Sequence, residues 1–332
     1  MARGAPADWD ATLMPWRRAN LLQARAWGQV QSRAGWRSHW LQVPTRLGVL
    51  PVLALSGPGG LPGFSRLYVP RGPVCEPDDL ESFAAVELAL RELGTRCRAL
   101  ALEVEPAWEE REVPPGHPWG SWAAAAARQP LATVVVDLGD EPERILQGFS
   151  AKTRYNVRLA ERRGVEVDER AQLSDLVHCL NATEARKGIH LPSPAHLGTV
   201  VAELGADCRI LAARVEGEVV AAILVAGFAG AAAYLYGGST GKHRERMPNH
   251  LLHWRAVLRA REEGRSEYDL WGVPENDDPA HPWRGLAQFK RGFAGHERRY
   301  AGARLLQLLP AGATIVGLVD AARRRARHRG RR

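Results

Sequence analysis

The strongest constraint on the fold is a regular alternation of segment types between Tyr234 and Phe293. The glycine-bounded run AAAYLYGG (231–238) is apolar and aromatic, which predicts the end of a buried strand. Apolar residues then recur at helical spacing over 251–258, with Pro248 in the first turn and Gly264 after the end. YDLWGV (268–273) predicts a second strand, and GLAQFKRGF (285–293) predicts a short basic helix.

The rest of the chain also predicts alternating strands and helices. We expect strands at 36–43, 46–57, 65–74, 98–106, 131–138 and 165–170, with an antiparallel meander over 208–238. We expect helices at 21–35, 76–94 and 313–330, one long basic helix over 141–164, and two helices within 173–205. The chain of 332 residues is therefore expected to be an α/β protein of two domains, with a boundary between Asp137 and Glu141.

Composition and charge narrow the class of protein. The net charge of +8 favours a polyanionic partner such as RNA, nucleotide phosphates or an anionic membrane face. Seven arginines lie within 323–332, so a solvated basic tail is the competing interpretation. No apolar run approaches the roughly 18 residues of a membrane span, and the N-terminus does not look like a signal peptide. We therefore expect a cytoplasmic protein, peripheral at the inner face of the membrane at most.

Two residue types carry further information. The cysteines, Cys75, Cys97, Cys179 and Cys208, are scattered without CxxC spacing, which predicts reduced thiols and neither a zinc site nor a disulfide framework. Among 45 basic residues only four are lysine: Lys152, Lys187, Lys242 and Lys290. Since arginine stands at nearly every other basic position, a remaining lysine is a candidate for a role that needs a compact charge or a tunable pKa.

Several motifs in order resemble one family. YLYGGST, MPNHLLHW, YDLWGVPE and QFKRGF are similar to the second half of an N-acyltransferase domain of the GNAT type, and more closely to the Fem-type aminoacyltransferases of the FemABX family. KTRYNVRLAERRGVEV (152–167) and LLQARAWGQ (21–29) match the same family in the same order. The resemblance covers most of the chain.

This resemblance implies a fold and an activity. The fold would be two tandem GNAT-like domains, residues 1–137 with 305–332 on the acceptor side and 138–304 on the tRNA side, without the helical arm of longer members. The activity would be transfer of an amino acid from aminoacyl-tRNA to a stem-peptide amine of a peptidoglycan precursor, either UDP-MurNAc-pentapeptide or lipid II, forming the cross-bridge of the cell wall. No cofactor or metal is implied, and we expect a monomer.

The first half offers three candidate site residues. Trp27 matches the tryptophan of a family helix that helps to hold the acceptor. The position of the lysine in that family helix is occupied here by Gln31. Arg71 lies in a loop resembling the family motif Y-x-P-R-G-P, where an arginine and backbone amides can face a phosphate or carboxylate. Glu105 stands where the family often has an aspartate considered as a base. Core packing of Trp27 and a structural turn at Arg71 are the competing interpretations.

The second half offers the rest. Lys290 of the Phe289–Lys290 pair matches the family lysine thought to contact the tRNA end and stabilise the transition state. Tyr234 and Tyr236 alternate on one strand and are expected to face the same side. Asp269 is a second candidate proton acceptor. Arg154 and Arg158 of the basic helix are expected to bind phosphates. The competing interpretation is a solvated helix face.

Two other functions remain open from the sequence. An acyl-CoA-dependent N-acetyltransferase would need a Q/R-x-x-G-x-G/A loop at a helix start, where backbone amides point at a pyrophosphate. The segment GGSTGKHRERMPNH (237–250) contains glycines but does not match that loop. A catalytically inactive, basic RNA-binding adaptor is the other alternative, and it would bind tRNA with a steep salt dependence.

Overall fold

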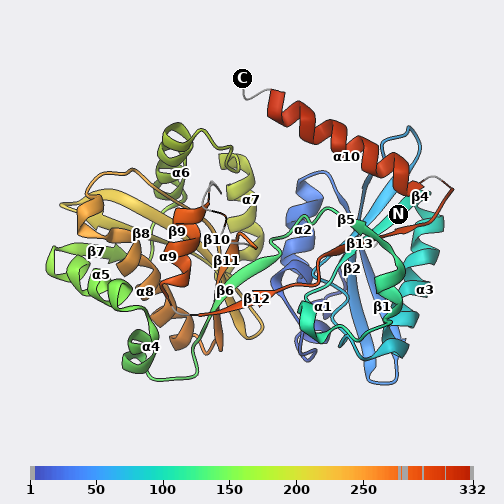
Figure 1. Cartoon of the computed structure of the whole chain (residues 1–332), viewed down its shortest axis with the longest axis horizontal. Coiled ribbons are helices and arrows are strands. Elements are labelled where there is room, and N and C mark those ends of the chain that lie inside the picture. Colours follow the sequence, from blue (N-terminus) through green and yellow to red (C-terminus); the bar gives the residue numbers. More distant parts are fainter. Residues whose placement is uncertain (1–3, 276–277, 279–282, 294, 311, 330–332) are drawn as a thin grey trace. The chain divides into compact units, whose positions relative to one another are not determined.

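Each half of the chain forms its own α/β unit. The computed structural model describes residues 4–275, 278, 283–293, 295–310 and 312–329. These residues divide into unit 1 (1–129 and 300–332) and unit 2 (130–299), and each unit holds one mixed sheet (Figure 1). The prediction of an α/β fold with two tandem domains is confirmed.

Unit 1 is built on a sheet with the strand order β1-β2-β3-β4-β13-β5. Its strands are β1 (Arg37–Thr45), β2 (Gly48–Pro58), β3 (Ser65–Pro70), β4 (Ala99–Glu105), β5 (Ala123–Ala125) and β13 (Ala303–Gln307). Its helices are α1 (Trp9–Leu13), α2 (Arg25–Arg33), α3 (Leu80–Arg96) and α10 (Gly312–Arg329), with 3-10 turns at Leu21–Gln23, Glu110–Glu112 and Pro118–Ser121. β3 and β4 are parallel, and the other pairs are antiparallel.

The helices of unit 1 cover both faces of its sheet. Ser38 of β1 donates a hydrogen bond to the carbonyl of Gly28 in α2, whereas the next residue, His39, contacts Cys97 at the end of α3. Successive residues of a strand point to opposite faces, so α2 and α3 lie on opposite sides. On the α2 side, Trp9 is fully buried and its indole N–H donates to the carbonyl of Gln23.

Unit 2 is built on a sheet with the strand order β12-β6-β11-β10-β9-β8-β7. Its strands are β6 (Ala132–Asp137), β7 (Val165–Asp168), β8 (Cys208–Val215), β9 (Glu218–Phe228), β10 (Ala231–Ser239), β11 (Glu267–Val273) and β12 (His296–Arg299). Its helices are α4 (Pro142–Gly148), α5 (Ala151–Arg162), α6 (Leu173–Lys187), α7 (Pro194–Leu204), α8 (Pro248–Glu262) and α9 (Arg284–Arg291), with 3-10 turns at Gly205–Asp207 and Arg244–Arg246. β10 and β11 are parallel and the other pairs antiparallel.

The predicted meander and the helices on either side of it are present. β8, β9 and β10 pair antiparallel in sequence order, as expected from the turns near Glu216 and Gly230. Figure 1 shows α6 and α7 over one face of this sheet and α5 and α8 over the other. The main core lies on the α5 and α8 face and includes Phe149, Trp254, Leu270 and Phe293.

The pairing of strands β6 and β13 shows which unit each of these segments belongs to. The segment 131–138, assigned to the first domain from the sequence, pairs as β6 with β11 and β12 of unit 2. The division therefore falls at 129–130, one strand earlier than the predicted boundary. β13 pairs with β4, so the C-terminal segment returns to unit 1. α10 follows it, and its backbone is helical through Arg329 of the basic tail, while 330–332 lie outside the described residues.

The prediction of one long helix over 141–164 is wrong. The chain forms α4 and α5, separated by Phe149 and Ser150 in extended conformation. Ser150 caps α5, because its hydroxyl accepts a hydrogen bond from the N–H of Thr153. The guanidinium of Arg154 donates to the carbonyls of Gln147 and Phe149 at the end of α4. These local bonds replace helical bonds across the break.

Close packing of α6 on β10 gives a first testable consequence. A Cβ at Gly238 would lie 2.5 Å from the carbonyl oxygen of Cys179 in α6, which is backbone and cannot rotate away. We expect Gly238→Ala to lower the free energy of unfolding by about 1–3 kcal/mol, the usual cost of overpacking. Urea unfolding measures this. Gly148→Ala is the matched control, because nothing lies within 4 Å of its Cβ position; equal midpoints for the two variants would contradict the packing.

Candidate functional site

The candidate site lies where two parallel strands of unit 2 separate. β10 and β11 pair only over Ala231–Ala233 and Glu267–Asp269. Beyond that point β10 continues along β9 to Ser239, while β11 continues along β6 to Val273. The register shifts in both strands at the split, between Tyr234 and Tyr236 and between Asp269 and Gly272. Bulges of this kind redirect side chains and are frequent beside active sites.

The bulge in β10 overturns one prediction. Tyr234 pairs with Val225 and Tyr236 with the neighbouring Leu224, so Leu235 is the extra residue. Neighbouring pairs in a ladder point to opposite faces, so the two tyrosines do not share a face. Tyr234 packs edge-on against His253 of α8, with ring centroids 4.7 Å apart. The hydroxyl of Tyr236 lies 3.1 Å from Nε2 of His196 in α7.

The bulge in β11 shapes the backbone around Lys290. Trp271 has φ of 63°, a left-handed conformation that a bulky residue adopts only under tertiary constraint. Its N–H donates to the carboxylate of Asp269 at 2.7 Å. The next carbonyl, that of Gly272, accepts a hydrogen bond of 2.8 Å from Nζ of Lys290. The bulge thus supplies the direct acceptor for the lysine.

Lys290 is a buried cation. It lies near the end of α9, is 4% exposed, and places Nζ 5.5 Å from the ring centroid of Tyr234. Burial lowers the pKa of Lys290 to about 8, and the negative charge of Asp269 partly offsets that effect. The other three lysines are exposed: Lys152, Lys187 and Lys242. The lysine singled out by the family resemblance is therefore the buried one.

Asp269 and several aromatic residues lie around Lys290 and the split strands. The carboxylate of Asp269 accepts hydrogen bonds from the hydroxyl of Thr133 on β6 and from Trp271. Phe289 packs into the core and contacts His250, His253 and Phe293. Burial raises the pKa of Tyr234 to about 12, so its phenol stays neutral near neutral pH. The desolvated ammonium of Lys290 and the hydrogen-bonded carboxylate of Asp269 thus lie at the split between the strands, among neutral aromatic side chains.

Sequence reasoning missed several residues of this site. His253 and Tyr268 are joined at 3.0 Å inside the core, and His250 lies 3.1 Å from the side-chain amide of Asn156 on α5. Thr133 holds Asp269 from a strand that is distant in sequence. One signal was available for the histidines: His250 and His253 lie three positions apart in MPNHLLHW, on the apolar face of the predicted helix.

The residues predicted in the first half lie in unit 1. Trp27 is buried in α2. Glu105 is fully buried at the end of β4 and accepts hydrogen bonds from the hydroxyl of Tyr68 at 2.7 Å and from the N–H groups of Arg128 and Gln129. Burial raises its pKa. Arg71 is 6% exposed, and its guanidinium stacks 3.6 Å from the ring centroid of Tyr300.

The two arginines of the basic helix differ in surroundings. Arg154 is engaged with the carbonyls of Gln147 and Phe149, so it holds the end of α4. Arg158 lies exposed on α5.

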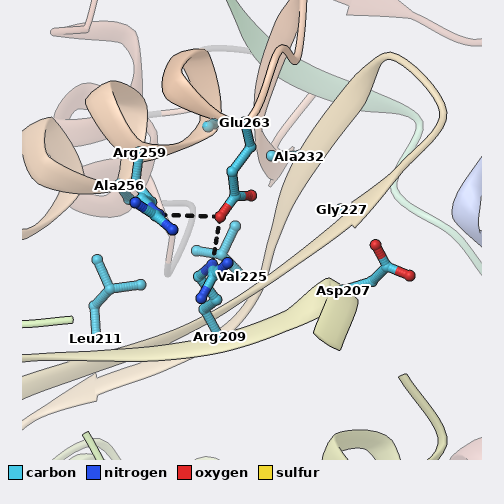
Figure 2. A pocket seen from close by; sticks show the side chains of 10 residues that line it. Asp207, Arg209, Leu211, Val225, Gly227, Ala232, Ala256, Arg259 and Glu263 are labelled. Atoms are coloured by element: carbon cyan, nitrogen blue, oxygen red, sulfur yellow. Dashed lines mark hydrogen bonds and ion pairs between the residues drawn. The ribbon is translucent and has the colours of Figure 1, made fainter. Parts of the chain in front are cut away.

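Two cavities among the described residues lie away from Lys290. A cavity of about 20 Å³ in unit 2 lies between β8, β9 and α8, where Glu263 is held by Arg209 and Arg259 (Figure 2). Its size suits water and no larger ligand. A hollow of about 700 Å³ in unit 1 runs along β1 past His39 and Cys97. Neither cavity is lined by a catalytic or substrate-binding residue that was predicted from the sequence.

No helix among the described residues is both long enough and apolar enough to cross a membrane. No group of three or more histidine, cysteine, aspartate or glutamate side chains within the described ranges is arranged to hold a metal ion.

Comparisons with known proteins agree with the two-unit fold. Residues 13–116 match the FemAB family and residues 149–291 match the acetyltransferase (GNAT) domain. The "Lipid II:glycine glycyltransferase" of Staphylococcus aureus is 22% identical over 86% of this chain and 87% of its own length. The crystal structure of FemX superposes with a TM-score of 0.83 at 17% identity, covering 93% of this chain and 98% of that one.

A second structure shares the fold less closely. The C-terminal domain of a putative lysylphosphatidylglycerol synthetase from Agrobacterium fabrum gives a TM-score of 0.55 at 15% identity, covering 95% of this chain and 96% of that one. The sequence-based resemblance to the FemABX family is confirmed. The chain is a distant homologue of the lipid II:glycine glycyltransferases, with a FemAB family segment in unit 1 and a GNAT domain in unit 2.

Proposed function

We propose that the chain is an aminoacyl-tRNA-dependent aminoacyltransferase that extends the stem peptide of a peptidoglycan precursor. The observation that carries the proposal is Lys290, a desolvated cation at the split between β10 and β11 of the GNAT domain. Similarity to curated lipid II:glycine glycyltransferases over 86% of the chain supports it. The same similarity favours a lipid-linked acceptor over a nucleotide-linked one.

The reaction makes few chemical demands. The stem-peptide amine attacks the ester carbonyl of the aminoacyl-tRNA, forming a C–N bond and a tetrahedral oxyanion. The amine loses its proton, the ester C–O bond breaks, and the tRNA leaves with its terminal hydroxyl restored. In this scheme the ammonium of Lys290 donates a hydrogen bond to the oxyanion, in a site where burial strengthens that interaction. Holding the two substrates together supplies much of the remaining acceleration.

The other predicted residues take weaker roles in this proposal. Asp269 orders the bulge of β11 and favours the protonated form of Lys290. Glu105 is fully buried and accepts three hydrogen bonds, so in our scheme it supports the structure of unit 1 and does not accept the amine proton. Arg158 and Arg71 remain our candidates for phosphate or carboxylate contacts, and Tyr236 remains one for the substrate. Trp27 and Phe289 act through packing.

The test offers the enzyme each donor and each acceptor separately. The purified protein is incubated with a charged tRNA pool and either lipid II or UDP-MurNAc-pentapeptide, and the products are weighed. We expect the lipid-linked acceptor to gain the mass of one amino acid. A parallel series replaces the tRNA with acetyl-CoA, because residues 149–291 match a GNAT acetyltransferase domain. Acetyl gain without any tRNA-dependent gain would overturn the proposal in favour of an N-acetyltransferase.

A further inference from the structure

His253 lies among the buried side chains that are packed around Lys290. It lies on α8 and is 2% exposed. Its Nδ1 is 3.0 Å from the hydroxyl of Tyr268 on β11. Its ring meets that of Tyr234 on β10 edge-on, at 4.7 Å and 88°. One imidazole therefore ties α8 to both strands at the split.

The surroundings of His253 favour a neutral ring. The charged and titratable groups that face it or its neighbours are Lys290 from α9, Asp269 and Tyr268 from β11, Tyr234 from β10, and His250 from α8, with Lys152 of α5 acting on His250. Burial, the charge of Lys290 and that of His250 together lower the pKa of His253 to about 3. Burial likewise keeps Tyr268 a neutral phenol, with a pKa well above 10.

The hydrogen bond between Nδ1 of His253 and the hydroxyl of Tyr268 can run in either direction, depending on the tautomer of His253. A phenol has one O–H to donate, and a buried donor without an acceptor is costly. A neutral imidazole has one ring nitrogen that accepts. If Tyr268 donates to Nδ1, the proton of His253 is on Nε2. This arrangement satisfies the phenol and brings no second positive charge beside Lys290.

We propose that His253 is a positioning residue that remains a neutral imidazole protonated on Nε2, accepts the hydrogen bond of Tyr268, and fixes Tyr234 and β11 where they keep water from Lys290. Its effect on catalysis rests on the proposed function, but its protonation state and its effect on Lys290 do not. His253 touches neither substrate in this scheme. It acts by fixing Tyr234 and β11 around the ammonium.

Nuclear magnetic resonance tests the first part without any activity. Labelling with ¹⁵N-histidine distinguishes an Nε2–H tautomer from an Nδ1–H tautomer and from imidazolium, and His253→Phe assigns the signal. We expect the Nε2–H form throughout pH 5–9 (roughly two pH units or more above the lowered pKa). A His253 that becomes protonated near its ordinary pKa, or that carries its proton on Nδ1, would overturn the proposal.

The second part uses the small number of lysines. With only four lysines, ¹³C labelling at Cε gives four titration curves, and the signal absent from Lys290→Arg is assigned to Lys290. We expect the Lys290 midpoint near pH 8 in the wild type. In His253→Ala the hole admits water, and the midpoint should rise by about one pH unit or more. In His253→Phe a ring still fills the space, and the midpoint should stay near the wild-type value.

A matched control separates this effect from general loss of stability. His117 is a buried histidine of unit 1, 4% exposed and in ring contact with Phe83 at 4.8 Å. His117→Ala, which leaves a similar hole in unit 1, should leave the Lys290 midpoint unchanged. An unchanged midpoint in His253→Ala, or an equal rise in His117→Ala, would overturn the positioning role. If His253→Ala does not fold, the tautomer measurement still decides the protonation state, and the recovery of kcat on adding Tyr268→Phe to His253→Phe decides the positioning role.

Transfer kinetics test whether the hydrogen bond between His253 and Tyr268 affects the reaction. His253→Phe leaves the Tyr268 hydroxyl without its acceptor, so we expect kcat to fall about tenfold with little change in KM. Adding Tyr268→Phe to this variant removes the hydroxyl that has lost its acceptor, so most of the lost kcat should return. Such recovery would show that the two residues are energetically coupled through one hydrogen bond. A double variant slower than His253→Phe would contradict the proposed bond. Absence of transfer by the wild type would defeat the proposed function and leave the spectroscopic result standing.

Discussion

Lys290→Met is expected to abolish most amino acid transfer while leaving the fold intact. Methionine fills a similar volume without the ammonium, so the oxyanion loses its donor. Removing one such donor from a preorganised site lowers kcat by about 10²–10³-fold. The pKa of Lys290 is lowered from 10.5 to about 8, which corresponds to a burial cost of about 3 kcal/mol at about 1.4 kcal/mol per pKa unit. The free energy of unfolding should therefore rise, by about 1–3 kcal/mol.

Opposite changes in activity and stability make this result specific. Single-turnover transfer and urea unfolding are measured on the same preparations. Lys187→Met is the matched control, because Lys187 is an exposed lysine in the last turn of α6. It should change the transfer rate by less than about twofold and the stability by less than about 0.5 kcal/mol, as surface substitutions usually do. A Lys290→Met variant that transfers at the wild-type rate would remove the lysine from the mechanism.

The elements of unit 2 were largely predictable because their signals are local. Glycines and apolar runs mark β8, β9 and β10, and the spacing of Leu251 to Leu258 marks α8. The bulge in β10 was not predictable from the same run. Inserting Leu235 keeps the tyrosine–leucine–tyrosine pattern that also describes a regular strand. Only pairing with β9 determines which of the two tyrosines faces α8.

The environment of each candidate residue depends on contacts that are distant in sequence. Lys290 was found from its motif, but its burial arises from Gly272, Tyr234 and the helix that carries His253. Glu105 was found as a carboxylate before a proline. Its full burial follows from the position of β4 between β3 and β13, strands from opposite ends of the chain. A sequence pattern identifies a chemical group, while its pKa and access depend on the whole sheet.

The break between α4 and α5 was not predictable from the sequence pattern. There, hydrogen bonds from side chains to the backbone replace the bonds of a continuous helix. Residues 141–164 lack an internal proline after Pro142, so a continuous helix was a reasonable expectation. The structure instead uses Ser150 as a cap and Arg154 as a clamp on the end of α4. The same Arg154 was predicted to bind phosphate. Its engagement with backbone carbonyls leaves Arg158 as the exposed arginine of that pair.

Transfer and stability are expected to respond in opposite directions to alkaline pH. Lys290 must carry its proton to donate to the oxyanion, so the rate should fall about tenfold per pH unit once the pH exceeds the pKa of about 8. Stability changes with the opposite sign. Between about pH 8 and 10.5 the unfolded chain keeps the lysine proton while the folded chain has lost it. Because the unfolded state then binds more protons, the free energy of unfolding rises with pH across this window.

Two variants isolate the lysine from other groups that titrate in this range. Lys290→Met should lack the rise in stability between pH 8 and 10.5 that the wild type shows. Lys290→Arg keeps a charge that is never lost at these pH values, so its residual transfer should not decline above pH 8. Rates are measured as initial single turnovers, corrected for the spontaneous hydrolysis of the aminoacyl ester. A wild-type rate that keeps rising to pH 9.5 would mean that the neutral amine of Lys290 is the active form, and the lysine would then act as a base.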